Sequence, residues 1–410
     1  WMVHSFPTRR SSDLNYIKRL IGLPGETIEV IDGDVYIDGL IARKPPQVQK
    51  ELWMPIYDND FRPVNPNQSG AFNGHPWKPP FRFEGTAWKI SEEDPTQLLL
   101  DSPVGRPSTL AYNAPTADDS DTSANGFADT YAYNEVFNYR RMPIVSDLMF
   151  RFYVNPADSQ GQIGVTLSKY GVDYKGWISL DGTMTLAKVD KGQETILATK
   201  KVDAPAPGVR TLVKFANVDH RLLLEFDGNE LSAELGRTSD AMKRDIAILP
   251  RAEIFGAGKL ALSHVALFRD VHYTGREGTR PARAVEGNPF KLNQDEFFAM
   301  GDNSPNSEDG RWWGQPTVAS RGWDPPRAGV VPRYYLVGKA LFVYWPSGFE
   351  FPWPSSVKST LAANSNQSGA MRLLHGLVSL RWIPNVGQMR FIYGGSADKT
   401  APPAQESVEK

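Results

Sequence analysis

The chain contains no cysteine, which excludes disulfide bridges, thiolate metal sites and cysteine nucleophiles. Its apolar runs stay below the roughly 18 residues that a membrane-spanning helix needs. The formal net charge is −2, so there is no basic excess of the kind that marks nucleic-acid-binding proteins. The six histidines show no H-x-x-x-H or H-E-x-x-H spacing, and no glycine-rich phosphate loop is present. The sequence therefore predicts no metal, no cofactor and no nucleic-acid partner.

The composition is that of a turn-rich β protein with more than one domain. At roughly 100–200 residues per domain, the chain of 410 residues allows two or three. Hydrophobic residues make up 40% and charged residues 22%, which permits a sizeable core and excludes global disorder. The 35 glycines, 32 prolines and 11% aromatic residues are typical of a protein built from short strands and turns.

The first residues look foreign to the rest of the chain. From His4 to Leu14, every residue matches the translation of a nucleotide string that resembles a sequencing-library adapter. Such segments are excluded from reasoning about the fold, so we interpret residues 1–14 as an adapter artefact. We expect native sequence to begin near Asn15, and we expect any membrane anchor that preceded it to be missing from this chain.

Strand patterns predict a sandwich in the middle of the chain. Residues 27–37 alternate β-forming and polar residues around an Asp-Gly pair, which predicts a hairpin. Residues 45–135 are rich in Pro, Asn, Asp and Ser, and we expect an irregular insertion with a few short strands. Residues 136–275 repeat short strands and turn signals, which favours an antiparallel β-sandwich. Its last strand, 265–273, resembles the closing strand of laminin-G/concanavalin-like jelly rolls.

Further strands are expected towards the C-terminus. Glu296–Met300 predicts a strand that runs into a polar loop, and Tyr334–Trp345 predicts one more strand with a glycine bend. The composition becomes polar after Gly395, so we expect residues 396–410 to form a disordered tail.

Two segments, about 280 residues apart, resemble a single family. Tyr16–Gly25 contains K-R-x-x-G-x-P-G and resembles the K-R-x-x-G-x-P-G-D box of type I signal peptidases. Gly301–Gly314 resembles their G-D-N-x-x-x-S-x-D-x-R-x-x-G box, and Leu336–Ala340 resembles the strand that follows it. Both boxes occur in the family's order. The resemblance covers roughly residues 15–44 and 290–345, with an unusually long insertion between them.

This resemblance implies a mostly β protein with a discontinuous catalytic domain. Residues 15–44 and 290–395 would form a signal-peptidase-like antiparallel β domain, into which the jelly-roll sandwich of 136–275 is inserted. The family removes signal peptides from exported proteins with a Ser–Lys dyad. The implied partners are signal peptides of preproteins, and membrane lipid through the missing anchor. The implied location is the bacterial cytoplasmic membrane, with the catalytic domain on its extracytoplasmic side.

The resemblance also implies roles for individual residues. Lys18 would be the general base, which requires an apolar setting because a charged ammonium group cannot accept a proton. Ser307 would hydrogen-bond the Lys18 amine and fix its direction. The site-supporting residues are Arg19 with Asp302, which would form an ion pair, and Asp309 with Arg311, which would hold the loop in shape.

Each of these residues also has a purely structural interpretation. A Lys-Arg pair beside apolar residues is usually a solvated strand edge, Gly-Asp-Asn is an ordinary turn, and Ser307 alone would suit a turn. Trp312 and Trp313 suit either a core or a membrane-facing edge. Three positions depart from the family pattern: Glu26, Ser304 and Gly310 stand where Asp, a basic residue and Ser are usual.

The nucleophile has no match in this chain. The family places its serine in an S-M-x-P-T box upstream of the lysine, and nothing upstream of Lys18 fits. Ser5-Phe6-Pro7-Thr8 is one residue short and lies inside the adapter-like stretch, so we reject it. We therefore expect the nucleophilic serine to be absent and this chain by itself to be inactive. The alternative is a non-catalytic protein whose sandwich binds glycan or peptide on a degenerate peptidase scaffold.

Overall fold

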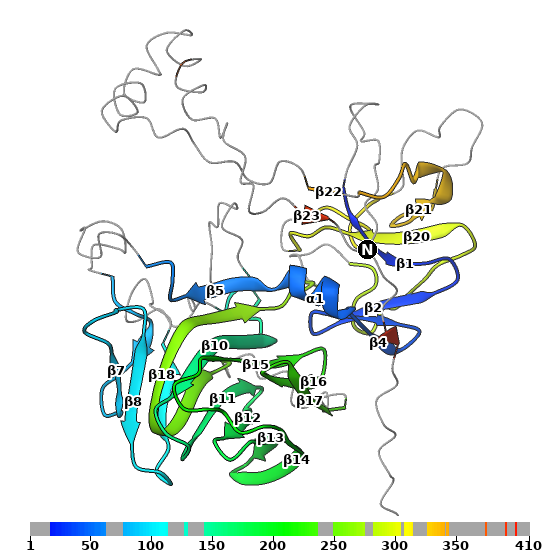
Figure 1. Ribbon diagram of the computed structural model, residues 1–410. Helices are drawn as coiled ribbons and strands as arrows, with labels where there is room; N and C mark the ends of the chain where they lie inside the picture. Colours follow the sequence, from blue (N-terminus) through cyan, green and yellow to red (C-terminus); the bar gives the residue numbers. More distant parts are fainter. Residues whose placement is uncertain are drawn as a thin grey trace, which may run out of the picture.

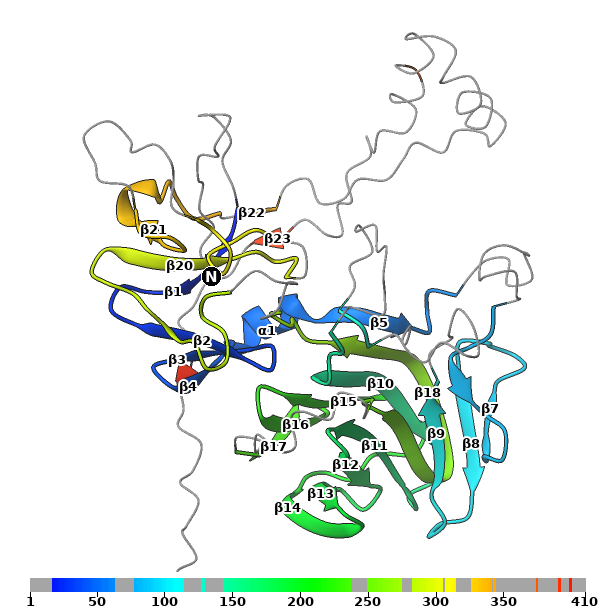
Figure 2. The same ribbon diagram turned by 180° about the vertical axis from the view of Figure 1, so that it is seen from behind.

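The computed structural model describes residues 17–62, 77–113, 127–129, 143–236, 249–274, 282–304, 307–314 and 326–340, and short stretches at 342–343, 374, 390–391 and 398–399. The adapter-like residues 1–14 lie outside this part. The described chain consists mostly of antiparallel strands (Figure 1, Figure 2). Its α-helix, α1, covers Pro46–Leu52, and no helix in the described part is long and apolar enough to cross a membrane.

Two small sheets bring together segments that lie far apart in the sequence. In the first, β1 (Arg19–Gly22) pairs with β20 (Glu296–Met300), which pairs with β21 (Val331–Pro332). The second has the order β19-β2-β3-β4-β24 and contains the predicted hairpin. The predicted pairing of the N-terminal and C-terminal segments is confirmed by β1 with β20 and by β2 with β19. The second sheet comprises β19 (Phe290–Lys291), β2 (Thr27–Ile31), β3 (Asp34–Ile37), β4 (Leu40–Arg43) and β24 (Asp398–Lys399).

We call these two sheets, with the loop Gly301–Gly314, the frame. A large β-sandwich is formed by the chain between the two halves of the frame (Figure 1). One of its sheets contains β7 (Trp88–Ile90), β8 (Leu98–Ser102), β5 (Met54–Asp58), β10 (Leu148–Pro156), β15 (Thr211–Val218), β16 (Arg221–Phe226) and β17 (Asn229–Glu234). The other contains β6 (Phe81–Arg82), β9 (Ser108–Tyr112), β11 (Gln162–Lys169), β12 (Val172–Ser179), β13 (Thr183–Asp190) and β14 (Gln193–Lys201).

One long strand, β18 (Ala252–Arg269), belongs to both sheets of the sandwich. Its first residues pair with β11 and β9, and its later residues pair with β10, β8 and β5. The change of sheet occurs at Gly256–Gly258. Gly258 has φ +94°, and a Cβ there would lie 2.5 Å from the Gln160 carbonyl oxygen, so only glycine fits this position.

The sandwich and the frame have separate hydrophobic cores. In the sandwich, β10 alternates buried and partly exposed residues, as a strand with one face against a core should. Phe150, Phe152 and Phe215 are fully buried there, and each contributes on the order of 1.5–3 kcal/mol through burial. The core of the frame is smaller and is centred on Ile28 and Phe298.

The strands of the sandwich begin well before residue 136. Residues 45–135 are predicted to be an irregular insertion with a few short strands, separate from the sandwich. Short strands do occur there, but β8 and β9 pair with β18, and Leu98 and Leu110 lie in the same buried cluster as Phe150. Their partner strand lies about 150 residues later in the sequence. Short strands of this kind are stabilised by their neighbours rather than by local preference, so the sequence pattern alone does not reveal them.

Two C-terminal predictions need correction. The single strand predicted for Tyr334–Trp345 is wrong, because Arg333–Tyr335 forms a 3₁₀ helix that the Leu336 amide closes by donating to the Arg333 carbonyl. Only Phe342–Val343 is strand in that range of described residues, and this strand, β22, pairs with β23 (Arg390–Phe391).

The predicted disordered tail is partly ordered. Asp398 and Lys399 form β24 against Arg43 and Ala42. The rest of residues 396–410 lies outside the described part of the chain.

The entry and exit strands of the sandwich lie side by side (Figure 1). β5 follows α1 and pairs antiparallel with the end of β18, so that Met54 lies opposite Arg269. The chain after β18 returns to the frame, where the Tyr273 amide donates to the Gly33 carbonyl at 3.1 Å. Both connections between the sandwich and the frame therefore leave from one edge of the sandwich.

Buried ion pairs also join the frame to the sandwich. The Lys44 ammonium, just after β4, lies 2.6 Å from Asp219 Oδ1 and 2.8 Å from Asp270 Oδ2. Lys169 pairs with Asp147 on the sandwich side. These ammonium groups are almost fully buried, so their carboxylate partners are needed to offset the loss of water.

Asp34 differs from its neighbours in this junction because no lysine or arginine among the described residues forms an ion pair with it. It is 6% exposed, and none of the described residues donates a hydrogen bond to its Oδ2 atom. Burial raises the pKa of the Asp34 carboxyl well above its ordinary value, and the nearby Asp147 carboxylate adds to this effect. His220 lies 3.6 Å away, but burial lowers its pKa to about 4, so it is neutral. The Asp34 carboxyl therefore keeps its proton to a higher pH in the folded protein than in the unfolded chain.

Asp34→Asn should be at least as stable as the parent protein at pH 7. Asparagine resembles the protonated carboxyl and needs no proton. In the parent, the Asp34 carboxyl loses its proton in the unfolded chain once the pH exceeds its ordinary pKa, so folding must take that proton up again, which costs free energy. The advantage of the variant should grow from about pH 4 upwards, by up to ~1.4 kcal/mol per pH unit, until the folded-state pKa is reached. Denaturant unfolding followed by tryptophan fluorescence across this range measures it.

Asp147→Asn is the matched control, because the pKa of the Asp147 carboxyl is lowered. Burial alone would raise this pKa, but the nearby Lys169 ammonium is the strongest of the influences that lower it. This variant removes the closest carboxylate partner of the buried Lys169 and leaves Asp32, whose Oδ2 lies 3.8 Å from the ammonium. A loss of up to about 3–5 kcal/mol is therefore expected at pH 7. An Asp34→Asn protein that becomes steadily less stable than the parent as the pH rises would contradict the raised pKa of Asp34.

Candidate functional site

The site is formed where β1 and β20 run beside each other. Arg19 lies opposite Met300 in this pair, so Lys18, just before β1, reaches the first residues of the loop that follows β20. Lys18 donates a hydrogen bond from its amine to Ser307 Oγ over 2.6 Å. Two residues 289 positions apart in the sequence are thus in direct contact.

Gly301 provides the space for this contact. A Cβ at this position would lie 1.8 Å from Ser307 Oγ and 3.2 Å from the Lys18 amine. Any larger residue would therefore displace Ser307, since real Cβ atoms do not approach other atoms so closely. The glycine of the Gly-Asp-Asn motif is explained by this close approach rather than by a turn conformation.

The surroundings of Lys18 make its amine easier to deprotonate. Burial lowers the pKa of Lys18 below its ordinary value, because the ammonium form loses hydration. The Asp309 and Asp302 carboxylates oppose this shift without reversing it. A lysine of this kind is suited to accept a proton, which an exposed lysine is not.

A fully buried ion pair supports the loop. Arg311 donates from Nε to Asp309 Oδ1 at 2.9 Å and from Nη2 to Asp309 Oδ2 at 2.6 Å, and both side chains are 0% exposed. The second carboxylate oxygen also accepts from the Gly301 amide at 2.9 Å. Asp309 therefore connects the buried guanidinium to the glycine that makes room for Ser307.

Arg19 has a partner that the sequence does not predict. Its guanidinium donates to the Tyr273 hydroxyl at 3.3 Å, from the segment that follows β18. The ion pair of Arg19 with Asp302 stays a prediction. Tyr273 carries no motif signal, because in the sequence it looks like the end of an ordinary strand.

Two further residues at the site are not identified by the motif. The Ser304 hydroxyl accepts from the Thr274 amide at 2.8 Å and from Arg311 Nη1 at 2.9 Å. Arg311 Nη1 also donates to the Thr274 carbonyl at 2.7 Å. Ser304 appears in the sequence only as a departure from the family pattern.

The tryptophan pair belongs to the core. Trp312 is 9% exposed, and Trp313 is partly buried against the cluster that contains Phe297, which favours the core interpretation of both residues.

In the described part of the chain, a cluster of three carboxylates has the spacing of metal ligands, but lysine ammonium groups already contact it. Asp34, Asp147 and Asp219 each place an oxygen within 4.8 Å of the others at the junction between frame and sandwich. The ammonium groups of Lys169 and Lys44 contact two of the three carboxylates. They supply the positive charge that a metal ion would bring, so the group is better described as an ion-pair network.

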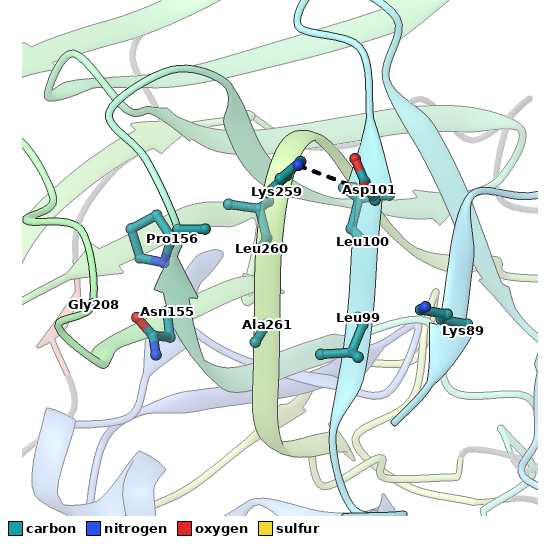
Figure 3. A pocket seen from close by; sticks show the side chains of 11 residues that line it. Lys89, Leu99, Leu100, Asp101, Asn155, Pro156, Gly208, Lys259, Leu260 and Ala261 are labelled. Atoms are coloured by element: carbon teal, nitrogen blue, oxygen red, sulfur yellow. Dashed lines mark ion pairs between the residues drawn. The ribbon is translucent and has the colours of Figure 1, made fainter. Parts of the chain in front are cut away.

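An open groove of about 400 Å³ lies on the sandwich rather than beside Lys18 (Figure 3). β7, β8, β10 and β18 form its walls, and Lys259 on β18 lies 3.9 Å from Asp101 on β8. Leu99 and Ala261, which are partly exposed, provide apolar surface. The groove shares no lining residue with the Lys18 site.

A family model matches the chain. It describes "Signal peptidase, peptidase S26" and covers residues 3–68 and 263–345, leaving the middle of the sequence unmatched. "Signal peptidase I" of Pseudomonas fluorescens is 30% identical over 100 residues, which is 23% of this chain and 34% of that protein. The chain thus spans about a third of the length of the curated relative that it matches. These matches support a relationship to the peptidase S26 family.

Solved structures resemble the chain only distantly. The carbohydrate-binding module CBM66 from Bacillus subtilis is 12% identical with a TM-score of 0.27, over 47% of this chain and 93% of that one. A Bacillus subtilis protein with a galectin-like fold is 9% identical with a TM-score of 0.31, over 53% and 97%. Likenesses this low carry no argument about function.

Gly301→Ala should disrupt the contact between Lys18 and Ser307. The new methyl group would overlap Ser307 Oγ, and overpacking of this kind costs about 1–3 kcal/mol. Gly314→Ala is the matched control in the same loop, because a Cβ there meets nothing within 4 Å and φ is not positive. Thermal unfolding should place the control close to the parent. Equal stability of the two variants would show that Gly301 is not tightly packed against Ser307.

Lys18 should titrate below the ordinary lysine range. Trace acetylation at a series of pH values, read for each lysine by mass spectrometry, gives the fraction of neutral amine directly. The midpoint for Lys18 is expected below pH 10.5, because burial disfavours its charged form. A midpoint at or above 10.5 would show that the acidic neighbours outweigh burial.

Proposed function

We propose that the frame is the catalytic part of a signal-peptidase-type serine endopeptidase in which Lys18 is the general base. The contact between the Lys18 amine and Ser307, together with the lowered pKa of Lys18, is the observation that carries the proposal. The match to the peptidase S26 model supports it independently, because both motif segments fall within the matched ranges.

The chemistry requires a second serine as the nucleophile. Its hydroxyl loses a proton to the neutral Lys18 amine as its oxygen attacks the scissile carbonyl, and the lysine then gives this proton to the leaving amine. Ser307 directs the amine by accepting a hydrogen bond from it. The nucleophile would be a serine other than Ser307, because Ser307 already serves as the partner of Lys18.

The proposed substrates are signal peptides of exported preproteins. The protein would act at the extracytoplasmic face of the bacterial cytoplasmic membrane. The sandwich would be a jelly-roll of the laminin-G/concanavalin kind. A non-catalytic protein that binds glycan or peptide through the sandwich remains the competing function, and the groove in Figure 3 is where such a ligand would be sought.

Cleavage of a signal-peptide substrate tests the proposal. The chain described above should show no turnover, and the chain extended by its native upstream segment should cleave. In the extended protein, Lys18→Ala should lower kcat/KM by more than the ~10²–10⁴-fold typical of one acid–base group, because the base is lost outright. Lys18→Arg should be equally inactive, since a guanidinium does not deprotonate at working pH. Ser307→Ala should be milder.

Lys201→Ala is the control for removal of a lysine, because this side chain is 64% exposed on the far strand β14 of the sandwich. It should leave cleavage unchanged. Turnover by the Lys18→Arg protein would disprove the role of Lys18. An extended protein without any cleavage, but with a ligand for the sandwich, would favour the binding function instead.

A further inference from the structure

We propose that Ser304 and Tyr273 are positioning residues that use the returning strand of the sandwich to hold the Lys18–Ser307 pair in place. The inference rests on the proposed function for its catalytic meaning. Neither residue has a role assigned to it by the motif: Ser304 departs from the family pattern, and Tyr273 comes from the end of the insertion rather than from the frame.

Ser304 joins two parts of the chain through a single hydroxyl. The side chain is 1% exposed, and Oγ accepts from the Thr274 amide at 2.8 Å and from Arg311 Nη1 at 2.9 Å. Thr274 is on the segment that leaves β18, and Arg311 is on the frame loop. An ordinary turn serine bonds within its own turn, whereas this hydroxyl connects segments 30 positions apart.

Tyr273 extends the same connection to the other side of the site. Its hydroxyl accepts from Arg19, which is the residue directly after Lys18. Its ring lies 5.9 Å from the Arg311 guanidinium, within the range of a cation–π contact. The returning segment therefore touches both the strand that carries Lys18 and the arginine that supports the loop of Ser307.

The contacts continue from Arg311 to the proposed base without a gap. Arg311 binds Asp309 through two nitrogen atoms, and Asp309 accepts from the Gly301 amide. Gly301 in turn lies against both Ser307 and the Lys18 amine. Without the Ser304 hydroxyl, Arg311 Nη1 and the Thr274 amide each lose one hydrogen-bond acceptor. Water must then enter to replace it.

This arrangement makes a specific prediction for Lys18. Once the loop loosens and admits water, the ammonium form regains hydration, so the lysine should titrate closer to its ordinary value. For each pH unit by which the midpoint rises, the fraction of neutral amine at a fixed lower pH falls about tenfold. Acetylation of Lys18 at about pH 8 should therefore drop several-fold in Ser304→Ala, measured on the folded chain itself.

Ser168→Ala is the matched control. Ser168 is 2% exposed, and its Oγ accepts from the Arg251 amide at 2.7 Å within the sandwich. This variant loses the same kind of buried hydrogen bond and should lose comparable stability, yet Lys18 should titrate as in the parent. A purely structural Ser304 would behave like Ser168, with lower stability and an unchanged Lys18 titration, and that result would overturn the proposal.

Tyr273→Phe is the second variant, and it decides the outcome if Ser304→Ala does not fold. It keeps the ring beside Arg311 and removes only the hydroxyl that accepts from Arg19. Its Lys18 labelling should fall in the same direction as in Ser304→Ala, and an unchanged titration would overturn the proposal.

Labelling of Lys18 does not depend on cleavage, so the two ideas fail separately. If Lys18 titrates differently in the variants but the extended protein cleaves nothing, the positioning role is supported and the peptidase function is contradicted. If Lys18 titrates as in the parent but the extended protein cleaves signal peptides, the peptidase function is supported and the positioning role is contradicted.

Discussion

The buried pair of Asp309 and Arg311 is the interaction on which the site depends. Its two side chains are completely enclosed, so each needs the other to offset the cost of leaving water. Their remaining hydrogen-bonding capacity is directed outwards, to the Gly301 amide on one side and to Ser304 and Thr274 on the other. Removal of either partner would strand a buried charge at the point where the frame loop, the returning strand and the proposed base meet.

The local parts of this structure were open to prediction from the sequence. The hairpin around Asp32 and Gly33 depends on turn chemistry between neighbouring residues, and β20 depends on a run of apolar residues that precedes a loop. The structure places Lys18, Ser307, Asp309 and Arg311 around Gly301, and all four come from the two motif segments. Their functional roles stay predictions.

The parts that depend on distant partners were not predictable in the same way. The sequences of β8 and β9 show only short, weak strand patterns, and these strands form because they pair with β18. The sequence of β18 gives no indication of these partners. Ser304 and Tyr273 acquire their contacts only because the returning segment comes close to Arg19 and to the loop that carries Arg311. The raised pKa of Asp34 likewise results from burial between frame and sandwich, and no motif marks this residue.

The pairing of β5 with the end of β18 has a consequence for how the protein folds. The two halves of the frame are separated by more than 200 residues, and closing so long a flexible loop costs conformational entropy. Once the sandwich has formed, however, Met54 and Arg269 are neighbours, and the frame halves are joined as if by a short linker. The frame would then assemble last, after folding of the insertion has already lowered the conformational entropy cost of bringing its two halves together. During translation, Lys18 would leave the ribosome early, and Ser307 would follow only 289 residues later.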